Sequence, residues 1–243
     1  MTSMTGSIER RDERQRDVTA SGTSHGFGMT DQLGEHGDDL IGDLRAARRP
    51  RLIVISGPSG VGKDTVIEQL RLRFPKAFFA VTATTRPRRP GEMDGVHYYF
   101  MDVETFNHRH ADNEFLESAN VYGYHYGVPR GPIKAALSRG QDVFVKVDIQ
   151  GAASIRQIVE HGVYIFLAPE SMSELMRRLR SRKTDDPEAL MQRFGTASRE
   201  LSAATEFDYV IFNESERTDQ AVEQITSILI AEHCRANQHD VII

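Results

Sequence analysis

One short segment of the chain has the composition of a loop that binds phosphate groups. It consists of Gly57, Pro58, Ser59, Gly60, Val61, Gly62, Lys63, Asp64 and Thr65. Glycines allow consecutive backbone N–H groups to surround phosphate oxygens, and the positive end of a following helix attracts the same anion. Lys63 would supply a mobile cation for the β- and γ-phosphates of a nucleoside triphosphate. An apolar run before the segment and an amphipathic pattern after it favour a nucleotide site over an ordinary glycine-rich turn.

The residue after this lysine departs from the common P-loop motif. A Ser or Thr hydroxyl normally stands there and binds Mg²⁺, whereas this chain has Asp64. A carboxylate can also bind Mg²⁺, directly or through a water molecule, although it places a second negative group beside a triphosphate. Asp64 is therefore a candidate Mg²⁺ ligand. In the alternative, phosphates, waters and Asp148 hold the metal.

A second basic segment, residues 82–92, contains three arginines, two prolines and a glycine. The prolines stiffen the loop, so its arginines would hold defined positions at a low cost in entropy. Arginine binds phosphate through two parallel hydrogen bonds, which suits a loop that receives a nucleoside monophosphate. From this segment alone, a solvated basic loop is an equally good interpretation.

Short β-branched and aromatic runs alternate with helical patterns from Arg51 onward. The expected buried strands are 51–56, 77–81, 142–147, 163–167 and 207–212. The expected helices contain the apolar faces of residues 66–74, 172–179 and 222–229. Ser171 and Glu174 form a capping box before the second of these. The alternation predicts an α/β fold of the P-loop NTPase type, with a parallel sheet covered by helices on both faces.

The composition excludes several classes of protein. A net charge of −5 argues against binding to nucleic acid, and Cys234 alone can form neither an intramolecular disulfide nor a cysteine metal site. No apolar run is long enough for a membrane span, and no secretory signal is present. We therefore expect a cytoplasmic protein that binds neither nucleic acid nor membranes. Composition is silent on the oligomeric state.

Four ordered motifs give the chain a specific resemblance. GPSGVGK, TTRPRRPGEMDGVHYYF, NEFLESANVYGYHYG and VDIQGA resemble the signature of guanylate kinases, over residues 51–235. The second and third motifs are far more specific than the first. Asp64 and the RKT segment at residues 182–184 resemble the organellar and related bacterial branch of that family. The resemblance implies transfer of the γ-phosphate of ATP, with Mg²⁺, to GMP.

The resemblance also implies roles on the acceptor side. It assigns the GMP phosphate to Arg86, Arg89, Tyr98 and Tyr126, and the guanine base to Thr82, Glu117 and Asp148. A carboxylate such as Glu117 only accepts hydrogen bonds and so fits the N1–H and N2–H₂ donors of guanine, whereas a hydroxyl can meet O6. As alternatives, Glu117 is a solvated strand charge and Tyr126 is simple cross-strand packing.

On the donor side, the resemblance places Asn213 at the adenine of ATP and makes Lys63, Arg182 and Arg193 catalytic. Lid arginines neutralise charge that grows on the transferred phosphoryl group while the closed lid expels water. A basic helix face is the alternative for such arginines, and Arg177, Arg178 and Arg180 are assigned to one. Asn213 could equally cap a turn.

Two further positions depart from the family pattern, and two other functions stay open. Val128 stands where a small hydroxyl residue is usual, and Lys146 where an acid is common. Lys146 would either extend toward phosphate or lie at the edge of the sheet. The alternatives are a kinase for a sugar bisphosphate, which should lack Tyr98 and Glu117, and a non-catalytic peptide-binding module, which should lack the P-loop.

The expected organisation combines these parts. A disordered tail (1–45) precedes a guanylate kinase domain (46–236), and a C-terminal tail (237–243) follows it. Within the domain we expect a core (50–81, 131–180 and 197–236), a GMP-binding region (82–130) and a lid (181–196). Within the tail, at most Asp39–Arg49 should form a short surface helix.

Overall fold

The computed structural model describes residues 36–44, 48–121, 123–181 and 187–243 of the chain. Residues 1–47 and 48–243 form two separate units. The described part of the first unit is a helix at residues 36–44, on which Leu40, Ile41 and Leu44 are exposed. At most a short surface helix was expected within Asp39–Arg49; residues 39–44 are helical, and residues 45–47 lie outside the described residues. The rest of the expected tail lies outside the described residues.

The second unit is built on a parallel sheet of five strands. These are β1 (Leu52–Ser56), β2 (Phe78–Phe79), β7 (Val143–Lys146), β8 (Val163–Pro169) and β9 (Tyr209–Asn213). Their order is β2-β7-β1-β8-β9, and all neighbouring pairs are parallel. Each of the five expected strands is present, and the α/β fold is confirmed.

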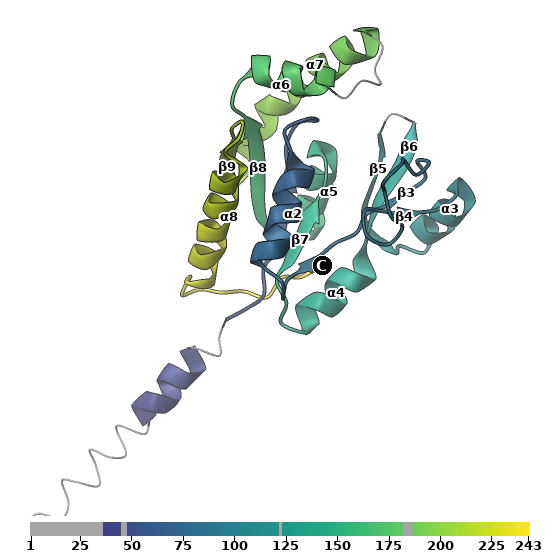
Figure 1. The fold of residues 1–243 in the computed structure, drawn as a ribbon. Helices are drawn as coiled ribbons and strands as arrows, with labels where there is room; N and C mark the ends of the chain where they lie inside the picture. Colours follow the sequence, from purple (N-terminus) through teal and green to yellow (C-terminus); the bar gives the residue numbers. More distant parts are fainter. Residues whose placement is uncertain (1–35, 45–47, 122, 182–186) are drawn as a thin grey trace, which may run out of the picture. The chain divides into compact units, whose positions relative to one another are not determined.

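Side chains of β1 alternate between two apolar cores, as the period of a strand requires. Ile53 and Ile55 pack with α2 (Lys63–Arg73) and α8 (Thr218–His233) on one face. Leu52 and Val54 pack with α4 (Arg130–Ser138) and α5 (Ile149–Ile158) on the other. Figure 1 shows these helices around the sheet. Burial on both faces explains why the strand sequence is continuously apolar.

A smaller mixed sheet occupies the region that was expected to bind GMP. Its strands are β3 (Ala83–Thr84), β4 (Tyr99–Phe100), β5 (Phe115–Val121) and β6 (Tyr124–Pro129), in the order β4-β3-β6-β5. The hairpin β5–β6 is antiparallel, and α3 (Val103–Ala111) packs Phe106 on Phe115 with ring centroids 4.6 Å apart. This sheet and α3 form an arm beside the main sheet (Figure 1).

Two helices follow β8 beyond its carboxyl end (Figure 1): α6 (Met172–Ser181) and α7 (Pro187–Leu201). The Ser171 hydroxyl caps α6 by accepting a hydrogen bond from the Glu174 N–H at 3.1 Å. The Glu174 carboxylate binds Arg177 and Arg178, so only the serine half of the predicted capping box is observed. α7 continues through the expected boundary between lid and core at residue 196 and ends before the 3₁₀ turn η1 (Ser202–Glu206).

Residues 237–243 were expected to form a tail after the domain, but they pack on the domain. Val241 and Ile243 contact the apolar core that contains α4 and α5. Ile242 forms an antiparallel bridge with Glu160, and the Gln238 side chain accepts a hydrogen bond from the Arg49 N–H at 2.8 Å. The expected C-terminal tail is thus part of the folded unit.

Two truncations should therefore have opposite outcomes. Deleting residues 1–47 should shift Tm by less than about 2 °C, because the described part of that segment is an exposed helix in a separate unit. Deleting residues 237–243 should lower Tm by several degrees through loss of Val241 and Ile243 from the core. Thermal unfolding of both proteins decides this, and a large loss of Tm in the first would show that the N-terminal segment supports the domain.

Candidate active site

The P-loop (residues 57–65) connects β1 to α2 at the carboxyl end of the parallel sheet, where ligands bind in folds of this kind. Gly57 has φ of 145° and Gly62 has φ of 100°. A Cβ at Gly57 would collide with the Leu167 carbonyl oxygen, and one at Gly62 with the Asn213 side-chain amide. Both positions therefore require glycine, as is expected of a loop whose backbone N–H groups surround a phosphate.

Lys63 is the first residue of α2, and its side chain turns back over the P-loop. The ammonium donates hydrogen bonds to the carbonyls of Gly57 and, at 3.1 Å, Pro58. Burial lowers the pKa of Lys63 to about 8, although Glu200 and other carboxylates act in the opposite direction. The side chain is still a cation at neutral pH, and it lies where the phosphates of a nucleotide would replace the loop carbonyls as its partners.

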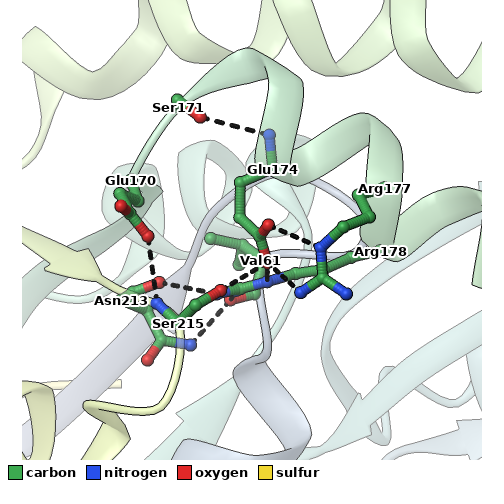
Figure 2. Close-up of polar contacts among 8 residues, drawn as sticks. All are labelled: Val61, Glu170, Ser171, Glu174, Arg177, Arg178, Asn213 and Ser215. Carbon is green, nitrogen blue, oxygen red and sulfur yellow. Dashed lines mark hydrogen bonds and ion pairs between the residues drawn. The ribbon is translucent and has the colours of Figure 1, made fainter.

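Two side chains from other elements hold the Val61 carbonyl of the P-loop (Figure 2). Asn213, the last residue of β9, donates to it through Nδ2 at 2.7 Å, and Arg178 of α6 donates through Nη1 at 3.1 Å. The second Nη of Arg178 donates to the Asn213 carbonyl at 3.2 Å and to the Ser215 hydroxyl at 3.1 Å. The guanidinium therefore links α6, β9 and the P-loop.

Glu174 orients this guanidinium from one turn earlier in α6. Its Oε1 accepts a hydrogen bond from Arg178 Nε at 2.8 Å and another from the Ser215 hydroxyl (Figure 2). Hydrogen bonds from Arg177, Ser215 and Arg178 hold the pKa of Glu174 well below its usual range. The assignment of Arg178 to a solvated basic face was wrong, because its side chain is only 20 % exposed while that of Arg177 is 69 % exposed.

The arginine-rich loop after β3 presents one buried guanidinium. Arg86 is 8 % exposed and is held by the Glu92 carboxylate at 2.6 Å and the Pro87 carbonyl at 2.7 Å. It lies 5.4 Å from the Tyr98 ring centroid, and the Tyr98 ring lies against that of Tyr126, with centroids 6.1 Å apart. A cation and two phenols at one place are groups that can donate hydrogen bonds to an anion.

Glu117 of β5 is a buried carboxyl beside the first turn of α5. A Cβ on Gly151 would lie 3.1 Å from its Cδ, and Asp148 caps the same helix by accepting from the Gly151 N–H at 2.7 Å. Within the described structure, Oε2 of Glu117 is buried without a hydrogen-bond partner. Burial, and then the charge of Asp148, raise the pKa of Glu117 to about 8. The interpretation of Glu117 as a solvated strand charge is excluded by its 7 % exposure.

Two residues that depart from the family pattern form an ion pair. The Lys146 ammonium, at the end of β7, binds Oδ1 of Asp64 in the first turn of α2. Burial opposes the charge of Lys146, but Tyr98 and Asp64 outweigh it and raise its pKa. The pair connects the P-loop side of the site to the acceptor side.

Glu200 of α7 also reaches the P-loop. Its carboxylate lies near the Ser59 backbone and attracts the Lys63 ammonium. Burial raises the pKa of Glu200, and this effect outweighs the charge of Lys63. A carboxylate from the end of α7 thus lies beside the loop that was expected to bind phosphate.

Comparison with known proteins identifies the family. The sequence model of guanylate kinase matches residues 49–232. The chain belongs to the guanylate kinase family. It is 45 % identical over 181 residues to a guanylate kinase of Carboxydothermus hydrogenoformans, covering 74 % of this chain and 88 % of the relative. It is 48 % identical over 165 residues to one of Thermobifida fusca, covering 68 % and 84 %.

A solved structure supports the same family. The crystal structure of guanylate kinase from Anaplasma phagocytophilum superimposes with a TM-score of 0.62 at 32 % sequence identity. The match covers 77 % of this chain and 88 % of that chain. The resemblance recognised from four sequence motifs is therefore confirmed over residues 49–232.

The structure places some of the expected site residues in detail and gives little or no information about others. The structure groups Arg86, Tyr98 and Tyr126 on the acceptor side and Glu117 with Asp148 beside α5. Thr82 lies directly before β3, and Arg89 is exposed, with its backbone N–H bound to Glu92 at 2.8 Å. Arg182 lies outside the described residues, and of Arg193 only its place in α7 is known.

Two residues of the site, Arg178 and Glu200, had no signal in the sequence, and Lys146 was recognised only as a departure from the family pattern. Arg178 and Glu200 reach the P-loop across more than a hundred positions of the chain, and Lys146 reaches Asp64 across 82. Val128, at the position of the usual hydroxyl residue, is completely buried in the core that contains Ile133.

Among the described residues, no helix is long and apolar enough to span a membrane.

Proposed function

We propose that this protein transfers the γ-phosphate of ATP to GMP, giving ADP and GDP. The observation that carries the proposal is the buried Glu117 carboxyl beside Asp148, with Oε2 unpartnered within the described part of the chain. A buried acceptor without a donor is costly, and the N1–H and N2–H₂ groups of guanine supply that donor pair. Adenine lacks the pair and would leave the carboxyl unsatisfied. dGMP shares the base, so it should also be an acceptor.

The remaining residues fall into two groups in this proposal. Those that hold the GMP phosphate are Arg86, Arg89, Tyr98 and Tyr126, and those that read guanine with Glu117 are Thr82 and Asp148. The P-loop and Lys63 bind the ATP phosphates, and Asn213 lies at the adenine end. A phosphate oxygen of GMP attacks the γ-phosphorus, the bond to the β–γ bridging oxygen breaks, and its electrons remain on ADP.

Mg²⁺ is the cofactor that such a reaction uses with ATP, and it neutralises charge on the β- and γ-phosphates when bound. The carboxylates of Asp64 and Asp148 both interact with Lys63 and are the hard oxygen donors of this region. No group of three or more acidic, His or Cys residues in the described segments could hold a metal unaided. The donor set therefore fits an ion bound mainly by phosphates and waters, with Asp64 a proposed ligand.

An acceptor panel tests the function. ADP release should be measured with ATP–Mg²⁺ and GMP, dGMP, AMP, UMP or ribose bisphosphate as acceptor. GMP should be the best acceptor, with dGMP next. Comparable turnover of AMP would contradict the guanine assignment, and preference for ribose bisphosphate would favour a sugar kinase. Absence of turnover with every acceptor would favour a binding module.

The lid arginines should act on the transferring phosphoryl group. Replacing Arg182 or Arg193 by Met should lower kcat by roughly 10²-fold and change either KM little, because they stabilise charge that appears only in the transition state. Arg180→Met, an exposed position on α6, is the matched control and should keep its kcat. A rise in the KM for ATP at constant kcat would show that the two arginines bind the ground state.

A further inference from the structure

Asp64 and Lys146, two residues that depart from the family pattern, form one structural unit. β7 and β1 are adjacent in the parallel sheet, so the carboxyl end of β7 lies beside the P-loop. Lys146 therefore reaches Asp64 in the first turn of α2, and their side chains form an ion pair. The usual hydroxyl and acid are replaced together by a carboxylate and an ammonium that bind each other.

The other side of the Lys146 ammonium faces the acceptor region. Lys146 Nζ lies over the Tyr98 ring, 5.4 Å from its centroid. Arg86 lies at the same distance, 5.4 Å, from that ring. The Tyr98 ring thus has two cations within reach, one from the arginine loop and one from the main sheet.

The Lys146–Asp64 ion pair contributes little to the stability of the fold. The Asp64 side chain is 67 % exposed, and an ion pair with an exposed partner contributes little to folding. Lys146 also repels the nearby Lys63, and both cations are partly withdrawn from water. Cations gathered in this way are favourable when an anion binds among them.

We propose that Lys146 is a phosphate-binding residue of the acceptor site, whose ammonium contacts the phosphate of the nucleoside monophosphate beside Tyr98. Asp64 is then a positioning residue that holds the Lys146 side chain from the P-loop. This inference rests on the proposed function. A cation between the P-loop and Tyr98 reduces the repulsion between donor and acceptor phosphates when both nucleotides are bound.

Binding without ATP or Mg²⁺ separates this role from catalysis and from the metal. Affinities for GMP and for guanosine, which lacks the phosphate, should be measured by calorimetry or competition for the wild type and Lys146→Met. The variant should lose about tenfold or more in GMP affinity, the effect of one charged hydrogen bond, and keep its guanosine affinity. Lys134→Met, an exposed lysine of α4, is the matched control and should bind GMP normally.

A second set of variants tests the role of Asp64. Lys146→Arg keeps the charge and should recover most of the GMP affinity, which also shows that loss in Lys146→Met is not a folding defect. Asp64→Asn should weaken GMP binding about threefold in the wild type and have no further effect in Lys146→Met, because it acts through the lysine. Tm should be recorded for every variant.

The outcomes distinguish the two proposals. A wild type that fails to prefer GMP over AMP contradicts the proposed function itself. A wild type that prefers GMP, with Lys146→Met losing equal affinity for GMP and guanosine or losing only Tm, overturns the Lys146 assignment and makes the ion pair structural. Additive effects of Asp64→Asn and Lys146→Met would remove the positioning role of Asp64.

Discussion

Replacing Lys63 by Met should lower kcat by about 10²–10³-fold, the largest single effect that the site predicts. In the structure the Lys63 ammonium is held over the P-loop by the carbonyls of Gly57 and Pro58. Phosphates that enter the loop would take over this cation, and its charge would stabilise the electrons that accumulate on the β–γ bridging oxygen. Steady-state rates with saturating ATP and GMP measure the loss.

The same variant should fold normally. Burial lowers the pKa of Lys63 to about 8, so its charge is disfavoured in the folded state and removal of the ammonium should not reduce Tm. Lys76→Met, an exposed lysine after α2, is the control and should keep both kcat and Tm. A Lys63→Met protein with near-normal kcat would mean that the P-loop lysine has no part in the transfer.

Glu117→Ala should lower kcat/KM for GMP by roughly 10–150-fold, because it removes the carboxyl whose oxygens would accept from the guanine N1–H and N2–H₂ groups once guanine binding has displaced its proton. Activity toward AMP should change little, so the preference for GMP should collapse. Glu117→Gln keeps the shape and one acceptor oxygen and should lie between the wild type and Glu117→Ala. An unchanged ratio of GMP to AMP turnover in Glu117→Ala would show that another residue reads the base.

Glu117 should also make the stability of the nucleotide-free protein depend on pH. Its pKa is raised from 4.5 to about 8 in the folded state, so the folded protein retains a proton that the unfolded chain releases. The stabilisation is complete below about pH 4.5 and is lost as the pH rises through 8, by at most about 1.4 kcal/mol per pH unit. Tm of the wild type should therefore fall from pH 6 to pH 9 more steeply than Tm of Glu117→Gln, and parallel curves would contradict the assignment.

Local sequence pattern was sufficient to predict the five strands of the main parallel sheet. The run from Leu52 to Ser56 is continuously apolar because both faces of β1 are covered, and that pattern is visible without knowing which helices cover it. The P-loop could be located for the same reason, since its glycines, its lysine and its place between strand and helix are all encoded within a few neighbouring residues. The family motifs extended the prediction to the residues that are expected to bind GMP.

Only the tertiary structure determines which groups the charged side chains of the site contact. Glu117 read as a plausible surface charge, and it is buried because β5 places it against Gly151 at the start of α5. Arg178 had the same sequence character as its exposed neighbour Arg177, yet the turn of α6 directs only Arg178 to Val61 and Asn213. Periodicity shows which side of an element is apolar but carries no information about which distant polar group a side chain will meet. Lys146 and Asp64 could each be recognised from the sequence as unusual, but only the adjacency of β7 and β1 shows that they bind each other.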